Sequence, residues 1–250
     1  MIYDIKNKKM KVIAKDEIIK LPNDLKEKIK ENFQLMKNGG ANIWNGKVIC
    51  VTKCDVTENE VEIICNKSDY AHYLYGERIG CTKEYECKNL SAGCLLETID
   101  GYYVLGELDD NTSYPTMLQV TGGGIDFKDI ESGIILPEKT IVREALEELN
   151  IDLDNKDLIL DNKLSYIYVS EENEQPGVQI FSKAIIKMTM LELRSYYENY
   201  YKYLRENDLE REFKKLHFLR KDVALEDLEK LENPKRNYIA PLLVMDKNKI

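Results

Sequence analysis

The chain has 250 residues, of which 43% are apolar and 32% charged, and its net charge is -9 at pH 7. This length supports one sizeable core with an appended region, or two modest domains. The apolar runs are far shorter than the roughly 20 residues that span a bilayer, and residues 1–10 lack the apolar core of a secretory signal. We therefore expect a cytoplasmic protein with no membrane segment, and an acidic balance without a basic run argues against a nucleic-acid partner.

The first part of the chain, residues 1–89, is predicted to be a β-rich N-terminal extension with one helix. Loose alternation in residues 1–20 indicates one or two strands, and apolar residues at helical spacing after Pro22 predict the helix, which should end at Gly39 and Gly40. The other elements expected here are a hairpin of residues 46–53 and 60–65, a short aromatic helix capped by Ser68 and Asp69, and a polar linker at residues 81–89.

The metal-binding potential of this extension is low. All six cysteines lie within the first 94 residues without a CxxC pair, and the chain has only two histidines, His72 and His217. This spacing does not suit a zinc site. We expect the thiols to be buried as small hydrophobic groups and both histidines to be structural.

Residues 90–250 interleave strands with helices. Two strands flank an Asp-Gly turn at residues 100–101, a glycine-rich loop follows at residues 122–124, and Pro137 begins a helix that runs to Leu149. This order indicates an α/β or α+β fold in which helices cover both faces of a mixed sheet. The remaining elements expected are strands at residues 164–169, 178–188 and 216–219 and helices at residues 189–205 and 224–231.

The helix expected at residues 137–149 carries an acidic face. With about 100° per residue, Glu144, Glu147 and Glu148 project within an arc of about 100°. Carboxylates so close repel one another unless cations lie among them, and hard oxygen ligands suit magnesium or manganese. An acidic helix face taken alone is more often simply solvated, so the residues around it decide its meaning.

Those surrounding residues resemble the Nudix box, in which glycine, five residues and glutamate are followed after seven residues by Arg-Glu-apolar-x-Glu-Glu-x-Gly-apolar. The chain has Arg-Glu-Ala-Leu-Glu-Glu-Leu-Asn-Ile from Arg143 to Ile151, which differs only where Asn150 replaces glycine. The substitution is mild. The residue after a helix often adopts the left-handed conformation, and asparagine tolerates this conformation best after glycine.

The first half of the motif departs further. Gly123 is followed after five residues by Asp129, but thirteen residues rather than seven then separate Asp129 from Arg143. We interpret the difference as an insertion of six residues around residues 131–136. Glu131 or Glu138 remains an alternative source of the acid.

The resemblance covers residues 90–250 and implies a Nudix-type α/β/α sandwich that hydrolyses a nucleoside diphosphate linked to another group. It implies that Glu144 and Glu148 are the principal, catalytic ligands of Mg²⁺ or Mn²⁺, that Glu147 is an auxiliary ligand, and that Arg143 orients them. The ions would bridge phosphate oxygens and lower the pKa of the attacking water.

The resemblance also assigns secondary roles. Gly122, Gly123 and Gly124 would bind substrate, and a carbonyl near Gly123 would complete the metal shell. Candidate general bases lie in the polar turn between two strands, although an exposed acidic loop is the commoner meaning of such a run. These candidates are Glu171, Glu172 and Glu174.

The expected substrate follows from a weaker likeness. Short strings at residues 43–47, 68–73 and 118–124, together with the enlarged box loop, resemble the branch of the superfamily that cleaves UDP-sugars. We therefore expect a nucleotide sugar such as UDP-glucose, with ADP-ribose and other nucleotide sugars as alternatives. Four tyrosines could stack a base, but a packing stripe is the favoured interpretation; they are Tyr196, Tyr197, Tyr200 and Tyr201.

Two further expectations come from analogy with the family. Its members are often dimers, which predicts a homodimer. The insertion and the replacements at Asp129 and Asn150 leave a second hypothesis open, a catalytically inactive Nudix-fold nucleotide-binding or regulatory module. We favour catalysis, because the changed positions lie outside the main ligand set.

Overall fold

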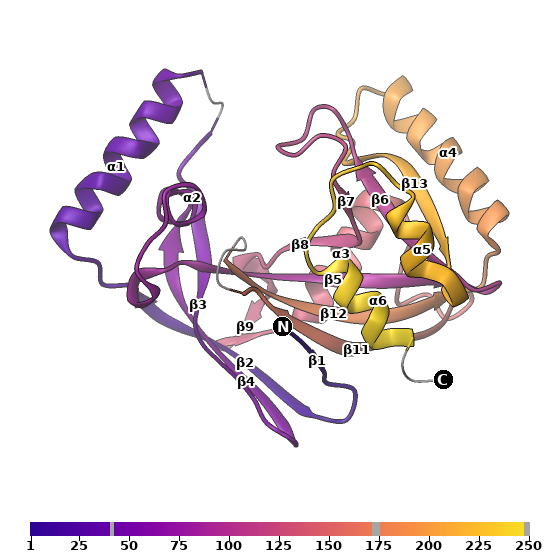
Figure 1. The fold of residues 1–250 in the computed structure, drawn as a ribbon, viewed down its shortest axis with the longest axis horizontal. Coiled ribbons are helices and arrows are strands. Elements are labelled where there is room, and N and C mark those ends of the chain that lie inside the picture. Colours follow the sequence, from indigo (N-terminus) through magenta and orange to yellow (C-terminus); the bar gives the residue numbers. More distant parts are fainter. Residues whose placement is uncertain (41–42, 172–175, 248–250) are drawn as a thin grey trace.

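A large mixed sheet forms the centre of the molecule, in a computed structural model that describes residues 1–40, 43–171 and 176–247 (Figure 1). Within the described residues, 13 strands pair in the order β1-β11-β12-β5-β3-β4-β2-β10-β9, with β6, β7, β8 and β13 attached beside this path. The strands are β1 (Ile2–Asp4), β2 (Lys9–Ile18), β3 (Lys47–Val56), β4 (Glu60–Asp69), β5 (Lys88–Thr98), β6 (Tyr102–Leu108), β7 (Leu118–Gln119), β8 (Thr121–Gly124), β9 (Ile130–Glu131), β10 (Ile134–Ile135), β11 (Ile159–Val169), β12 (Gly177–Ile186) and β13 (Phe213–Arg220).

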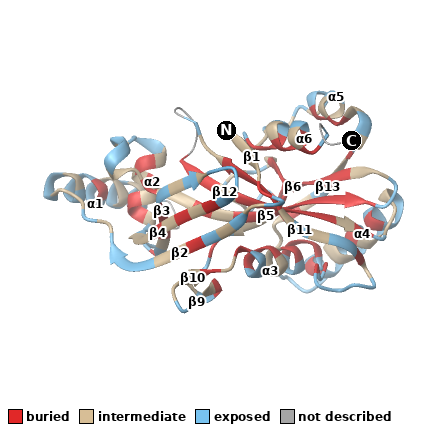
Figure 2. Ribbon diagram, turned by 90° about the horizontal axis from the view of Figure 1, so that it is seen from below, coloured by how far each residue is buried: buried red, intermediate tan, exposed pale blue. Residues whose placement is uncertain are grey.

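Helices cover both faces of this sheet, so the predicted mixed α+β architecture is confirmed (Figure 2). One core lies under the third and fourth helices, and a second lies under the fifth and sixth. Strand β5 contributes to both by alternation, because Ala92, Cys94 and Leu96 belong to the first core and Leu95 to the second. The helices are α1 (Asn23–Asn38), α2 (Tyr70–Arg78), α3 (Pro137–Leu149), α4 (Met190–Glu206), α5 (Ala224–Glu229) and α6 (Ile239–Lys247), with 3-10 turns at Lys83–Tyr85, Phe127–Asp129 and Lys221–Val223.

The N-terminal residues join the same sheet at two places. Strand β1 pairs antiparallel with β11, with Tyr3 opposite Ile167. Strands β2, β4 and β3 extend the sheet on the other side, where Cys50 of β3 lies opposite Asn89 of β5. Helices α1 and α2 stand over this extension (Figure 1). The division at residue 89 stays a prediction, while the hydrogen-bonded sheet continues across it.

Two local predictions were wrong, and one helix was missed. The glycine-rich stretch at residues 122–124 is strand β8, which pairs with Ser91–Cys94 of β5, because glycine lets two backbones approach closely. The linker at residues 81–89 already contains the start of β5, and its remaining residues hold a 3-10 turn. Helix α6 was not foreseen, because its sequence is apolar on all sides and lacks the amphipathic period.

The inserted residues of the box loop are ordered as a small hairpin. Strands β9 and β10 pair with each other, and Ile134 of β10 lies opposite Ile13 of β2. The amide of Ala14 also donates to the carbonyl of Gly133 at 2.9 Å. The insertion thereby ties the N-terminal strands to the loop that precedes α3.

No helix in the described parts of the chain combines the length and apolar character needed to cross a membrane.

Candidate metal centre and adjoining cavity

Helix α3 holds the predicted box, and its sequence explains where it begins and ends. Pro137 occupies the first turn, where its missing amide costs no helical hydrogen bond. Ile141, Ala145 and Leu149 form the buried stripe toward the core. Asn150 ends the helix with φ of 57°, the left-handed conformation expected where the motif has glycine.

Helix α4 holds the C-terminal end of α3 in place. The Tyr200 hydroxyl donates to the carbonyl of Glu147 at 2.9 Å, and the Tyr196 hydroxyl donates to the carbonyl of Asn150 at 2.7 Å. Tyr197 is buried and donates to the carbonyl of Phe213. The favoured interpretation of the tyrosine stripe as packing is therefore confirmed.

Three carboxylates converge above α3. Glu144, Glu148 and Glu212 each offer one oxygen, and these oxygens lie within 4.8 Å of one another. Glu144 and Glu148 come from successive turns of α3, and Glu212 directly precedes β13. Hard oxygen donors gathered in this way suit Mg²⁺ or Mn²⁺.

Glu148 is the buried member of this carboxylate trio, with only 4% of its surface exposed. One of its oxygens, Oε2, accepts hydrogen bonds from the Thr121 hydroxyl and from the amide of Gly122, the latter at 3.0 Å. The other, Oε1, is buried without a hydrogen-bond partner among the described residues. A buried carboxylate oxygen is costly when unpaired, so this atom requires either a cation or a protonated neighbouring carboxyl group.

The electrostatics of the trio also favour a cation. Burial raises the pKa of Glu148 well above its usual value, and the nearby Glu212 carboxylate raises it further. Burial likewise raises the pKa of Glu144, against the opposing effect of Arg143, and the pKa of Glu212. A divalent cation among these groups would stabilise their ionised forms. It would thereby offset both the cost of burying the carboxylates and the repulsion between them.

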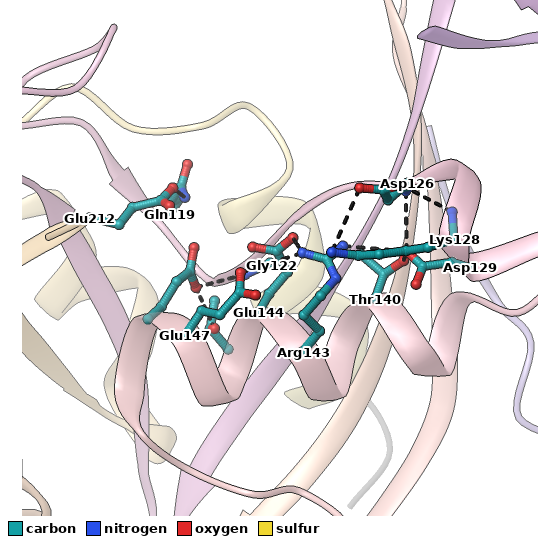
Figure 3. A network of polar contacts seen from close by, with 12 residues as sticks. Gln119, Gly122, Asp126, Lys128, Asp129, Thr140, Arg143, Glu144, Glu147 and Glu212 are labelled. Carbon is teal, nitrogen blue, oxygen red and sulfur yellow. Dashed lines mark hydrogen bonds and ion pairs between the residues drawn. The ribbon is translucent and has the colours of Figure 1, made fainter. Parts of the chain in front are cut away.

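Arg143 orients Glu144 from the side. Its guanidinium lies 2.5 Å from Glu144 Oε1 and 3.3 Å from Asp129 Oδ2 (Figure 3). Asp129 is buried, and its Oδ2 also accepts from the Thr140 hydroxyl and the amide of Asp126. Asp129 is therefore the acid that reaches Arg143, whereas the alternatives Glu131 and Glu138 are exposed, and its assignment to the motif stays a prediction.

The glycines of β8 allow these side chains to approach the backbone. A Cβ atom on Gly123 would lie 2.6 Å from Glu144 Oε1. Gly122 has φ of 147°, and a Cβ there would lie 2.4 Å from the carbonyl oxygen of Ala92. A side chain at Gly122 would therefore push β8 away from β5, and one at Gly123 would displace the Glu144 carboxylate.

Not every predicted site residue joins the trio. The side chain of Glu147 is 59% exposed and lies 3.5 Å from Arg143, so its auxiliary role stays a prediction. Glu171 is exposed and lies 3.2 Å from the N-terminal ammonium group, while Glu172 and Glu174 lie outside the described residues. Sequence reasoning missed Glu212, because no local pattern in the charged stretch before β13 distinguishes it from its neighbours.

A cavity of about 340 Å³ opens beside the trio. Glu212, Gly122 and Gly123 line it at the end nearest the carboxylates, and Gly124 also lines it. The size falls within the range of roughly 300–1,000 Å³ that small-molecule sites occupy. A ligand in this cavity would contact Glu212 of the trio and the backbone of β8 together.

The other predictions for polar side chains agree with the structure. His72 is buried between the Ser68 hydroxyl and the carbonyl of Tyr85, and His217 lies 2.7 Å from a Glu107 oxygen. Four of the six cysteines are buried, and the remaining Cys54 and Cys81 are partly exposed.

No protein-family model matches the sequence, and no curated protein matches it. Distant likenesses occur among solved structures. A Nudix hydrolase from Nitrosomonas europaea is 14% identical, covers 64% of this chain and 88% of its own, and gives a TM-score of 0.39. A C. elegans Ap4A hydrolase in a binary complex is 15% identical, covers 64% of this chain and 96% of its own, and gives 0.38. A bifunctional NMN adenylyltransferase/ADP ribose pyrophosphatase from Francisella tularensis, complexed with AMP and a manganese ion, is 10% identical, covers 70% of this chain and 46% of its own, and gives 0.43.

Proposed function

We propose that the protein is a Nudix-type hydrolase that cleaves the diphosphate bond of a nucleoside diphosphate linked to another group. The observation that carries this proposal is the buried, unpartnered Oε1 of Glu148 within a trio of carboxylates that lie within 4.8 Å of one another. A carboxylate that the protein buries and leaves half unpaired is suited to hold a divalent cation.

The ligands proposed for Mg²⁺ or Mn²⁺ are Glu144, Glu148 and Glu212. Bound divalent cations supply Lewis-acid stabilisation of the charge that develops on phosphate oxygens, and they make water a better nucleophile at neutral pH. Thr121 and the amide of Gly122 fix one Glu148 oxygen, which would leave the other available to a bound cation. Arg143 pairs with both Glu144 and Asp129. The ion pair with Asp129 holds the guanidinium in position, and the guanidinium in turn fixes Glu144.

The finer substrate assignment is a nucleotide sugar such as UDP-glucose, with ADP-ribose as the alternative. It is supported by the weak likeness of the N-terminal strings and by a cavity large enough for a nucleoside beside the trio. The inactive binding module remains the competing hypothesis. The structure favours the enzyme, because the inserted residues form a hairpin that leaves α3 intact and Asp129 still reaches Arg143.

Glu148→Gln tests this proposal, with Glu138→Gln as a matched control on the same helix. With magnesium and UDP-glucose or ADP-ribose, the protein should release a nucleoside monophosphate. Loss of one ligand charge at the reacting centre should lower kcat by about 100-fold or more. Glu138→Gln should stay within about fivefold, because Glu138 is exposed in the first turn of α3 and is not one of the three clustered carboxylates.

Chromatographic quantification of the monophosphate checks both variants, and thermal unfolding checks that they fold. Full activity of Glu148→Gln would remove Glu148 from the site. Nucleotide binding without turnover by the unmodified chain, with either ion, would support the inactive module instead.

A further inference from the structure

The cavity beside the carboxylate trio is walled partly by the N-terminal extension. Tyr73 of α2 lines it together with Tyr114, from the segment between β6 and β7. The Tyr114 hydroxyl donates to the carboxylate of Glu77, also on α2. The helix therefore contributes one aromatic ring to the cavity and holds a second ring in position.

A third segment completes this wall. The guanidinium of Arg236, which precedes α6, lies 4.6 Å from the centroid of the Tyr114 ring. Both Arg236 and Tyr114 line the cavity. Segments from the N-terminal region, the middle of the chain and its C-terminal part thus meet on one side of the space. A cation stacked on a ring holds that ring at a fixed orientation.

The rest of the cavity combines aromatic rings with an amide. Phe181 and Tyr238 line it with ring centroids 4.9 Å apart. Gln179 of β12 lines it as well, and its side-chain oxygen is buried without a hydrogen-bond partner among the described residues. Such an oxygen requires an N–H or O–H donor. Flat rings and an unpaired acceptor together suit a planar heteroaromatic group that carries an N–H.

The position of the cavity narrows the choice of ligand. Glu212, Gly122 and Gly123 belong both to its lining and to the surroundings of the trio. A ligand whose phosphates lie at the trio would therefore extend into the aromatic part of the space. Nucleobases are planar groups that stack on aromatic side chains and present N–H donors at their edges.

We infer that this cavity binds the nucleobase of the substrate and that α2 selects the base, through the Tyr73 ring and the Glu77–Tyr114 hydrogen bond. The inference rests on the proposed function, since a nucleotide substrate is what joins a base to phosphates at the carboxylates. Tyr73 and Tyr114 are specificity-determining residues here. The N-terminal extension is then part of the substrate site within the same chain.

The test uses Tyr73→Ala and Tyr114→Phe, with Tyr75→Ala as the matched control. Tyr75 lies on the same helix, two residues after Tyr73, and does not line the cavity. Loss of one stacked ring should raise KM for the preferred nucleotide substrate by about tenfold to 100-fold, with kcat little changed. Tyr114→Phe keeps the ring and removes only its hydroxyl, so KM should rise by about threefold to tenfold.

A second measurement does not depend on turnover. Calorimetric titration with AMP, UMP, GMP and CMP in the presence of magnesium should show weaker binding to Tyr73→Ala and Tyr114→Phe, and unchanged binding to Tyr75→Ala. Gln179→Leu should alter the ratio of the four affinities, because its oxygen meets a different edge group on each base.

The outcomes separate the two proposals. If the unmodified chain neither cleaves nor binds any nucleotide, the proposed function fails. A different result overturns only the base-selection inference: the unmodified chain cleaves nucleotides, but Tyr73→Ala and Tyr114→Phe have the same affinities and KM values as Tyr75→Ala. The hydrolase proposal then stands. Tyr114→Phe retains the bulk of the ring, so it keeps the test valid if Tyr73→Ala proves unstable.

Discussion

Two residues at the proposed metal centre, Asn150 and Glu212, differ in how far the sequence alone predicts their structural roles. Asn150 was predicted from a motif position to adopt a left-handed conformation, and its φ is 57°. Its role is local, since one backbone angle ends α3. Glu212 has the opposite character, because its carboxylate lies close to that of Glu148 only once distant parts of the chain have folded together. No property of its own neighbours in the sequence indicates that arrangement.

The variants Asn150→Gly and Asn150→Ala separate the contribution of the left-handed backbone angle from that of the Asn150 side chain. Both variants lose the hydrogen bond from the Asn150 amide to the Tyr196 hydroxyl, so their difference isolates the backbone angle. Alanine should be less stable than glycine by about 1 kcal/mol, because a Cβ atom is strained in the left-handed region. Urea denaturation of the two variants measures the difference. Equal stabilities would show that α3 ends in another conformation in solution.

At the scale of elements, helix α6 is attached to the sheet through buried charges. Asp246 accepts hydrogen bonds from the hydroxyls of Tyr103 and Tyr166 and lies 3.0 Å from the Lys183 ammonium group. Lys183 also pairs with Glu97 at 2.5 Å. Burial opposes the ionisation of Asp246, but Lys183 and the two hydroxyls outweigh it and hold its pKa below the usual 3.8.

Asp246→Asn should therefore lower the free energy of unfolding at pH 7 by about 3 kcal/mol, since it leaves a buried ammonium group less well paired. A lowered carboxyl pKa contributes stability above its unfolded value, and this contribution is lost as the pH falls through the folded value. The difference in free energy of unfolding between the unmodified protein and Asp246→Asn should be constant from pH 5 to 8 and shrink below about pH 4.

Urea unfolding across this pH range provides the measurement. Asp16→Asn is the control, because Asp16 is exposed and its ion pair with Lys67 should not affect stability measurably. A gap that stays constant down to pH 3 would show that Asp246 does not titrate with the lowered pKa.

For the whole molecule, the main question is whether residues 1–89 are a separable domain. The sheet pairs β1 with β11 and β3 with β5, and the hairpin of the box insertion pairs with β2. Removing the extension would leave edges of β5, β10 and β11 in the remaining sheet without partners. Unpaired edges destabilise a sheet and promote aggregation.

Deletion of residues 1–86 should therefore lower Tm by at least about 10 °C, or prevent soluble expression. A shorter deletion of residues 1–6 removes β1 alone and separates its contribution from that of β2 to β4. Differential scanning calorimetry compares the three chains. A truncated protein with unchanged Tm and KM would establish an independent catalytic domain and contradict a shared substrate site.

The sequence by itself determined the elements with a strong local signal. The bounds of α3, the capped start of α2 at Asp69 and the hairpin of β3 and β4 follow from helical or alternating periods and from turn residues. The proximity of Glu144 and Glu148 followed too, because residues four apart lie on one face of a helix, whereas the roles given to them and to Arg143 came from the resemblance and stay predictions.

The tertiary structure alone decided the third carboxylate, the strand formed by Gly122, Gly123 and Gly124, the docking of the insertion on β2 and the cavity wall from α2. Each of these depends on segments that are distant in the chain and meet only after the sheet has formed. Periodicity and turn signals act over a few residues, whereas such contacts are set by the packing of the whole sheet and its helices.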